Sequence, residues 1–265
     1  MTDSYLPYVQ GREIEWLELN LLKSNMPLSK STVMSLANDV DENDVDSWFS
    51  ELIDRGYDLE LCIYEQRGNT IYPLYRWDSI PEYFLCLYFC YFGASKDKIG
   101  TKLFERISSI ALKNYIGGEI KTFGFPSDTN LNRFLDEVAP LCFEQRGILA
   151  HPDYKDDGVD VLCYKNFGDS RSGNMYVLLQ CAAGINWTSK SPINLTRWVR
   201  YIYWPQSNLL TSIATTEYIQ KSSWVKRVDD YGLLLDRCRV TNWYSKMIDN
   251  DLRNEVIDWC NDKKI

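Results

Sequence analysis

The chain has 265 residues, of which 45% are hydrophobic and 25% are charged, and this balance is ordinary for a soluble globular protein. The length allows one large domain, or a small domain beside a larger one. No run of 18 uncharged apolar residues occurs, and the first residues lack the basic and apolar segments of a secretion signal, so we expect no membrane span, no signal peptide and a cytoplasmic protein.

The eight cysteines form no Cys-x-x-Cys pair and His151 is the single histidine, so we expect buried, reduced thiols and no zinc site. The net charge of −8 is unevenly distributed. Residues 39–60 hold nine acids and one base, whereas residues 190–240 hold eight bases and four acids. The overall acidity argues weakly against nonspecific nucleic-acid binding, but the second half is locally basic. A solvated acidic helix with chance asymmetry explains the pattern equally well.

Helical and extended patterns divide the first 75 residues into three helices and a hairpin. The helices are expected at residues 10–24, from Ser29 or Ser31 to Asn38, and from Asp41 to Arg55, with Gly56 as the stop. The strands are expected at residues 59–64 and 70–75. This order resembles a winged helix, but the acidity of the third helix disfavours entry into a DNA groove. A docking or packing role is the better interpretation.

The rest of the chain alternates helices with strands. Helices are expected at Pro81–Phe92, 100–115, 130–142, 194–204 and 243–261, and Gly117 should end the second of them. Strands are expected at residues 119–123, 159–164 and 175–181, the last two joined as a hairpin. We therefore expect a mainly helical docking or regulatory domain at residues 1–90 and an α/β domain at residues 91–265.

Polar side chains stand at the ends of that hairpin. Asp160 begins the first strand, Gln180 lies near the end of the second, and Glu105 lies at the edge of the apolar stripe of the helix at 100–115. Mg²⁺ prefers oxygen ligands, usually one or two carboxylates with water and phosphate oxygens, and it activates water for phosphodiester hydrolysis. Asp160 and Gln180 are therefore candidate metal ligands, with the Cys181 carbonyl as an alternative to the Gln180 amide oxygen, and Glu105 is a candidate supporting carboxylate.

Several segments together resemble a known superfamily. They are Gly100-Thr-Lys-Leu-Phe-Glu105, Phe123-Gly-Phe-Pro126, Asp156-Asp-Gly-Val-Asp160, Leu179-Gln-Cys-Ala-Ala-Gly184, Trp187 with Lys190, and Asp236-Arg-Cys-Arg239. Over residues 95–240 the arrangement resembles the PD-(D/E)XK restriction-endonuclease-like superfamily, and within it an uncharacterised bacterial group associated with genome defence. The resemblance implies a mixed sheet flanked by helices, with a Glu on a helix, an Asp on one strand and an (Asp/Glu/Gln)-x-Lys motif on the next.

One position departs from the superfamily pattern. The motif lysine is expected at position 182, where this chain has Ala182. Lys190 is the candidate catalytic replacement if the segment after Gly184 folds back, and Lys165 is a weaker candidate. If neither lysine reaches the metal, the site binds metal poorly or is inactive.

Each candidate also has a purely structural interpretation. Asp160 could be a turn residue, Gln180 a satisfied polar residue, Glu105 a solvated helix residue and Lys190 a surface lysine. Arg237 and Arg239 would bind DNA phosphates in the functional interpretation, but a structural ion-pair cluster with Asp236 is the more natural one.

The resemblance implies a Mg²⁺- or Mn²⁺-dependent DNA endonuclease, or the nuclease-like subunit of an anti-phage system with protein partners. The alternative is a catalytically inactive nuclease-fold subunit that binds partner proteins in a defence complex. A winged-helix regulator is a third hypothesis, disfavoured by the acidic third helix.

Overall fold

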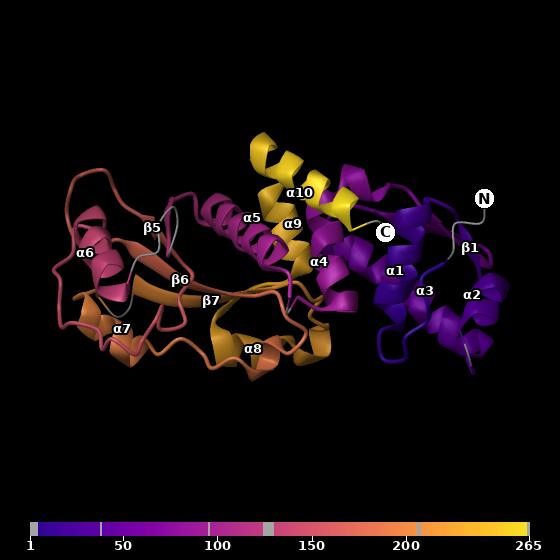
Figure 1. Cartoon of the computed structure of the whole chain (residues 1–265), viewed down its shortest axis with the longest axis horizontal. Helices are drawn as coiled ribbons and strands as arrows, with labels where there is room; N and C mark the ends of the chain where they lie inside the picture. The colour runs from indigo at the N-terminus through magenta and orange to yellow at the C-terminus, as the bar shows by residue number, and fades with distance from the viewer. Residues whose placement is uncertain (1–4, 38, 95, 124–129, 206–207, 264–265) are drawn as a thin grey trace.

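The computed structural model describes residues 5–37, 39–94, 96–123, 130–205 and 208–263. The molecule is elongated, with the N-terminal helices at one end and a β-sheet at the other (Figure 1). No helix in the described part of the chain is both long and apolar enough to cross a membrane.

The N-terminal region consists of three helices and a small sheet. The helices are α1 (Glu13–Ser24), α2 (Lys30–Leu36) and α3 (Glu42–Asp58), and the strands β1 (Leu28–Ser29), β2 (Tyr64–Arg67) and β3 (Thr70–Pro73) lie in the order β1-β3-β2. Ser29 caps α2 through its side chain, and Asp41 forms a capping box with Asp44 at the start of α3. The end of the expected second helix, Asn38, lies outside the described residues.

Two boundaries in this region were predicted wrongly. Helix α3 continues past Gly56 to Asp58, and the following strand starts at Tyr64 instead of residue 59. Gly56 does not end the helix, because the helical hydrogen bonds continue past it to Leu59, whose N–H donates to the Arg55 carbonyl at 3.0 Å.

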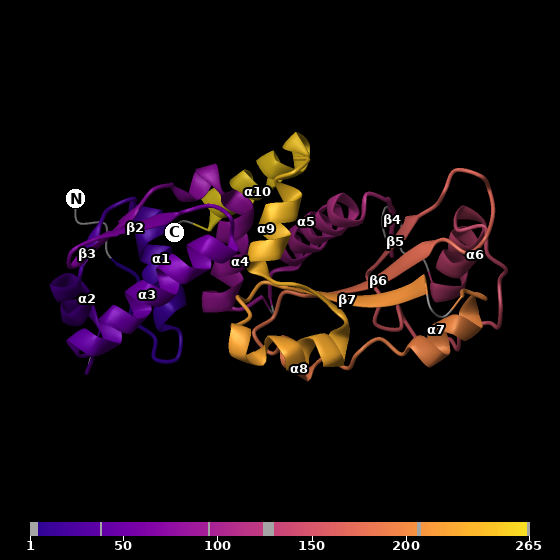
Figure 2. The ribbon, with the colours of Figure 1, turned by 180° about the vertical axis from the view of Figure 1, so that it is seen from behind.

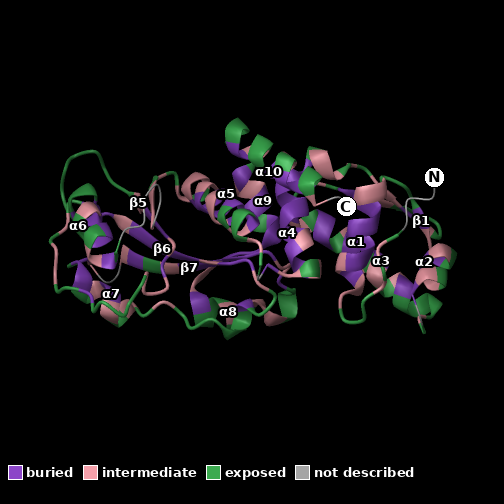
Figure 3. Cartoon of the chain, in the orientation of Figure 1, coloured by how far each residue is buried: buried purple, intermediate pink, exposed green. Residues whose placement is uncertain are grey.

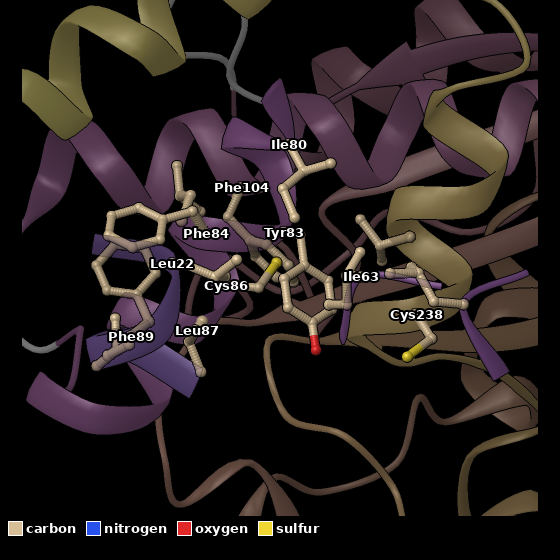
Figure 4. Packing of buried hydrophobic residues seen from close by; sticks show 14 of the residues in the cluster. Leu22, Ile63, Ile80, Tyr83, Phe84, Cys86, Leu87, Phe89, Phe104 and Cys238 are labelled. Carbon is tan, nitrogen blue, oxygen red and sulfur yellow. The ribbon is translucent and has the colours of Figure 1, made fainter. Parts of the chain in front are cut away.

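Four helices form the middle of the molecule. They are α4 (Pro81–Phe92), α5 (Lys98–Ile116), α9 (Arg237–Tyr244) and α10 (Asn250–Asp262), and a short 3-10 turn, η1 (Trp77–Ser79), precedes α4. Helix α4 is apolar on almost every side because α1, α9, α10 and α5 all pack against it. Figure 4 shows this packing around Tyr83, with Phe84, Phe89 and Phe104 from two of the helices nearby.

The large sheet has five strands. They are β4 (Glu119–Thr122), β5 (Val161–Lys165), β6 (Met175–Ala182), β7 (Leu209–Thr215) and β8 (Leu233–Leu235), in the order β4-β5-β6-β7-β8. The pairs β4–β5 and β5–β6 are antiparallel, and β6–β7 and β7–β8 are parallel. The predicted α/β architecture, a mixed sheet flanked by helices with a small, mainly helical N-terminal part, is confirmed.

Helices cover both faces of this sheet. Side chains of β5 and β6 alternate between two cores: Val161 and Leu179 face α5, whereas Leu162 and Leu178 face α6 (Leu131–Leu141) and α7 (Leu195–Tyr201). Helix α8 (Lys221–Tyr231) lies on the opposite side of the sheet from α5 (Figure 2). Buried faces of the helices turn inward and exposed faces outward (Figure 3). The largest core is continuous from α1 through α4 to the sheet, and it therefore crosses the expected boundary at residue 90.

Candidate active site

A cleft of about 690 Å³ opens where α5, the start of β5 and the end of β6 meet. Its lining includes Glu105 from α5, Asp160 from the residue before β5, and Lys190 from the residue after the 3-10 turn η2 (Trp187–Ser189). Ala182 and the backbone of the following residues form the floor. Three of the predicted site residues, far apart in the sequence, therefore share one cleft.

Asp160 is fixed by hydrogen bonds to β6, the second strand of the hairpin. Its N–H donates to the Leu179 carbonyl at 2.9 Å, and its Oδ2 accepts the Cys181 N–H at 2.6 Å. Burial raises the pKa of Asp160 to about 6, against the lowering effect of the Cys181 N–H and the nearby Lys190 ammonium. Asp160 is thus a partly buried carboxylate at the cleft, not a solvated turn residue.

The loop before Asp160 is held in an unusual conformation. Asp157 and Gly158 both have positive φ, at 49° and 80°. Asp157 accepts hydrogen bonds from Arg197 at 2.5 Å and from the Tyr201 hydroxyl at 3.1 Å, so α7 anchors the loop. This anchoring sets the direction in which the chain enters β5 and therefore where Asp160 stands.

Glu105 faces Asp160 from α5. Burial, with the charge of Asp160 as the second cause, raises the pKa of Glu105 to about 7, while Lys102 opposes the rise. Two partly buried carboxylates, both with a raised pKa, in one cleft are an arrangement that a bound cation stabilises.

Lys190 reaches the same place from the turn η2. Its Nζ donates to the Cys181 carbonyl at 3.2 Å, next to the N–H that binds Asp160. The segment after Gly184 folds back as a 3-10 turn, which is how a lysine eight residues beyond position 182 comes to the cleft. Lys165, at the opposite end of β5, instead donates to the Ile116 carbonyl at 3.0 Å.

Gln180 does not line the cleft, although it stands beside Asp160 across the hairpin. By strand alternation its side chain lies on the α6 and α7 side of β6, where its Nε2 would be 3.3 Å from a methyl group at Gly158. It is 7% exposed, and its Oε1 is buried without a hydrogen-bond partner. A buried oxygen of this kind needs a donor or a cation, so Gln180 stays a candidate ligand on the far side of Asp160.

The donor set fits a Mg²⁺-type cation better than a metal held by many side chains. No group of three or more His, Cys, Asp and Glu side chains suited to a metal ion occurs in the described part of the chain. Mg²⁺, however, needs only one or two carboxylates and keeps several waters. Asp160, Glu105 and the Cys181 carbonyl supply hard oxygen donors of that kind in the cleft, whereas the orphan oxygen of Gln180 lies outside it.

The two arginines predicted to contact DNA differ sharply. Arg237 is fully buried and its Nη2 forms an ion pair with Glu18 at 2.8 Å, so its expected role as a DNA contact is wrong. Its role is structural, but the partner is Glu18 and not the expected Asp236, which caps α9. Arg239 is exposed, with its guanidinium over the Trp224 ring and its Nη1 donating to the Leu234 carbonyl.

Some cleft residues were not predicted as site residues. Lys98 and Thr101 line the cleft two turns and one turn before Glu105 on α5, and Trp187 lines it from η2. Lys98 and Thr101 stand seven and four residues before Glu105, so all three lie on the same face of the helix. This spacing is a signal that the sequence alone offers. The motif segment Gly124-Phe-Pro126 lies outside the described residues.

No family model matches the sequence, and no curated protein matches it. Among solved structures, the chain is similar to the MspJI restriction endonuclease, which was solved in complex with a 27-mer oligonucleotide. The match has 16% identity and a TM-score of 0.32, and it covers 66% of this chain. The chain spans about a third of that endonuclease, 35% of its length.

Proposed function

We propose that the protein is a Mg²⁺- or Mn²⁺-dependent DNA endonuclease. The observation that carries the proposal is the meeting of Asp160, Glu105 and the Lys190 amine in one cleft. Enzymes of the superfamily that the sequence resembles require a carboxylate and a lysine at the reacting phosphate. Because Ala182 stands at the position where that lysine is expected, the amine has to come from another residue. Lys190 supplies the amine from the next turn.

Each side chain has a distinct role in this proposal. Asp160, Glu105 and the Cys181 carbonyl would hold the cation, whereas Gln180 lies outside the cleft and would support the loop before Asp160 from the other face of the hairpin. The cation, when bound, would activate water and neutralise phosphate charge. The Lys190 ammonium would stabilise the negative charge that develops on the phosphate, and Lys98, which also lines the cleft, would attract the DNA backbone.

The setting follows from the same resemblance. We propose that the protein acts in the bacterial cytoplasm as a nuclease or nuclease-like subunit of an anti-phage system, with residues 1–90 contacting a protein partner and residues 91–265 carrying the nuclease. The acidic surface of α3 supports this role for the N-terminal region, because an acidic helix repels DNA and suits a protein partner.

The first experiment measures metal binding and DNA cleavage together. Thermal unfolding of the wild type should shift upward with Mg²⁺ or Mn²⁺, and Asp160→Asn should remove most of this shift. Cleavage of plasmid and linear DNA should require the metal and should fall at least about 100-fold in Asp160→Asn. Asp153→Asn, an exposed carboxylate in the same loop, is the matched control and should behave as wild type.

A second pair of variants tests the lysine. Lys190→Met and Lys165→Met each remove an exposed amine that donates to a backbone carbonyl, but only Lys190 lines the cleft. Cleavage should fall in Lys190→Met and not in Lys165→Met. If the metal stabilises neither the wild type nor the variants and cleavage is absent, the inactive partner-binding subunit becomes the better function.

A further inference from the structure

A polar bridge connects the N-terminal region to the turn that carries Lys190. Arg12, the residue before α1, forms an ion pair with Glu217 at 3.3 Å between Nη1 and Oε1. The other oxygen of Glu217 accepts the indole N–H of Trp187 at 3.0 Å. One carboxylate therefore joins the start of α1 to the first residue of η2.

Trp187 is well placed to set the position of Lys190. The Lys190 N–H donates to the Trp187 carbonyl at 3.0 Å, which closes the turn. The Trp187 ring is 4% exposed and packs against Tyr231, and Arg227 lies over its face at 5.3 Å. A movement of this ring would therefore carry the backbone of Lys190 with it.

A second anchor holds the other end of the turn. The Tyr231 hydroxyl donates to the Lys190 carbonyl at 2.9 Å and lies 3.2 Å from the Thr188 carbonyl. This anchor belongs to the sheet side of the molecule, at the end of α8. Of these contacts to the turn, the one through Glu217 leads to the N-terminal region.

The turn also separates two cavities. The first is the cleft with Asp160, and the second, of about 480 Å³, lies between the turn and the N-terminal helices. Trp187 lines both cavities, and Arg12 and Glu217 line the second. The N-terminal helices therefore face the back of the turn whose end presents Lys190 to the cleft.

We propose that Trp187 and Glu217 are positioning residues for Lys190, and that Arg12 makes the N-terminal region a control element of the cleft. A partner or movement that draws Arg12 away from Glu217 would loosen the turn and withdraw the amine from the Cys181 carbonyl. The inference rests on the proposed function only in giving Lys190 a role in cleavage. The positional part can be measured without any nuclease activity.

The test is competitive acetylation of lysines, followed by peptide mass spectrometry, on the full chain. Trp187→Phe keeps a ring but removes the indole donor, and Glu217→Gln weakens the pair with Arg12 while keeping an acceptor. Lys190 should react about five-fold faster in Trp187→Phe, as expected for losing about 1 kcal/mol of hydrogen bonding, with a smaller rise in Glu217→Gln and in Arg12→Gln. Lys165, which also donates to a backbone carbonyl, is the internal reference and should not change.

Trp204→Phe is the matched control variant. Trp204 is 5% exposed and its indole also donates to a backbone carbonyl, that of Trp198 at 3.1 Å, but it lines neither cavity. It should leave the reactivity of Lys190 unchanged. An equal rise in the acetylation rate of Lys190 in this variant would mean that the effect comes from general loosening of the fold, and it would overturn the proposal. An unchanged acetylation rate of Lys190 in Trp187→Phe would also overturn it. If Trp187→Phe does not fold, Glu217→Gln and Arg12→Gln carry the same comparison.

Cleavage kinetics then separate the two proposals. Trp187→Phe should lower kcat with little change in KM, because the amine acts on the reacting phosphate and not on DNA binding. Faster acetylation with unchanged kcat would overturn control of the cleft by the bridge. If the wild type does not cleave DNA at all, the proposed function fails, while the acetylation result still decides whether the bridge holds Lys190.

Discussion

Glu105→Gln should change how the stability of the protein depends on pH. The folded-state pKa of Glu105 is about 7, above the ordinary value of 4.5, because burial and the charge of Asp160 disfavour the carboxylate. The folded protein therefore binds this proton more tightly than the unfolded chain, and stability falls as the pH rises from 4.5 to 7. Glutamine has no proton to lose, so the variant should lack this part of the fall.

The size of the effect follows from the same values. A rise in pKa from 4.5 to about 7 corresponds to about 3 kcal/mol of lost stability at pH 8. Partial exposure of Glu105 screens the interaction, so we expect about 1–2 kcal/mol. The stability of the variant relative to wild type should therefore increase by that amount between pH 5 and pH 8.

Urea unfolding at pH 5, 6, 7 and 8, with a chelator present, gives the required free energies. Glu119→Gln is the control, since Glu119 is exposed on β4 and pairs with Lys113 at 2.8 Å. Parallel pH curves for wild type and Glu105→Gln would refute the reasoning, because they would mean that Glu105 has no raised pKa in the folded protein. Added Mg²⁺ should stabilise the wild type more at pH 8 than at pH 5, where protons compete for the same carboxylates.

Three other substitutions test the surrounding structure by urea unfolding. Glu18→Gln should cost about 3–5 kcal/mol, because it leaves the buried Arg237 without the carboxylate that it pairs with and removes one of the carboxylates around Arg55; a loss below about 1 kcal/mol would contradict that pairing. Gly100→Ala should destabilise by about 1–3 kcal/mol despite the better helix propensity of alanine, since the added methyl group would lie 2.6 Å from Phe89 and 2.8 Å from Trp259, and a stabilised variant would refute this tight packing. Asp41→Ala should cost about 1 kcal/mol through the lost capping box, and an unchanged unfolding midpoint would exclude that role.

Much of the fold could be predicted from local sequence signals. Helix α4 matches its predicted limits, Asn130 caps α6, and Gly117 ends α5 in the left-handed conformation. These features depend on neighbouring residues alone. Strands β7 and β8 with helix α8 were not predicted, because β7 is a parallel strand whose partner β6 ended 27 residues earlier, and no tight turn marks such a pairing.

The site was predictable in part for the same reason. Asp160 and Glu105 stand in segments whose secondary structure is set locally, and both reach the cleft. Lys190 could be predicted as a candidate, but its position in the cleft could not, because that position depends on how η2 packs against Glu217 and Tyr231. Arg237 was assigned to DNA because nothing near it in the sequence shows its partner, which is Glu18 at the other end of the chain.

The pair between Glu18 and Arg237 joins residues 219 positions apart. During synthesis the N-terminal helices leave the ribosome first, and Glu18 then has Arg55 but not its second arginine. The apolar surface of α4 is likewise not fully covered until α9 and α10 have been synthesised. Completion of the N-terminal region is therefore a late event that follows synthesis of the whole sheet.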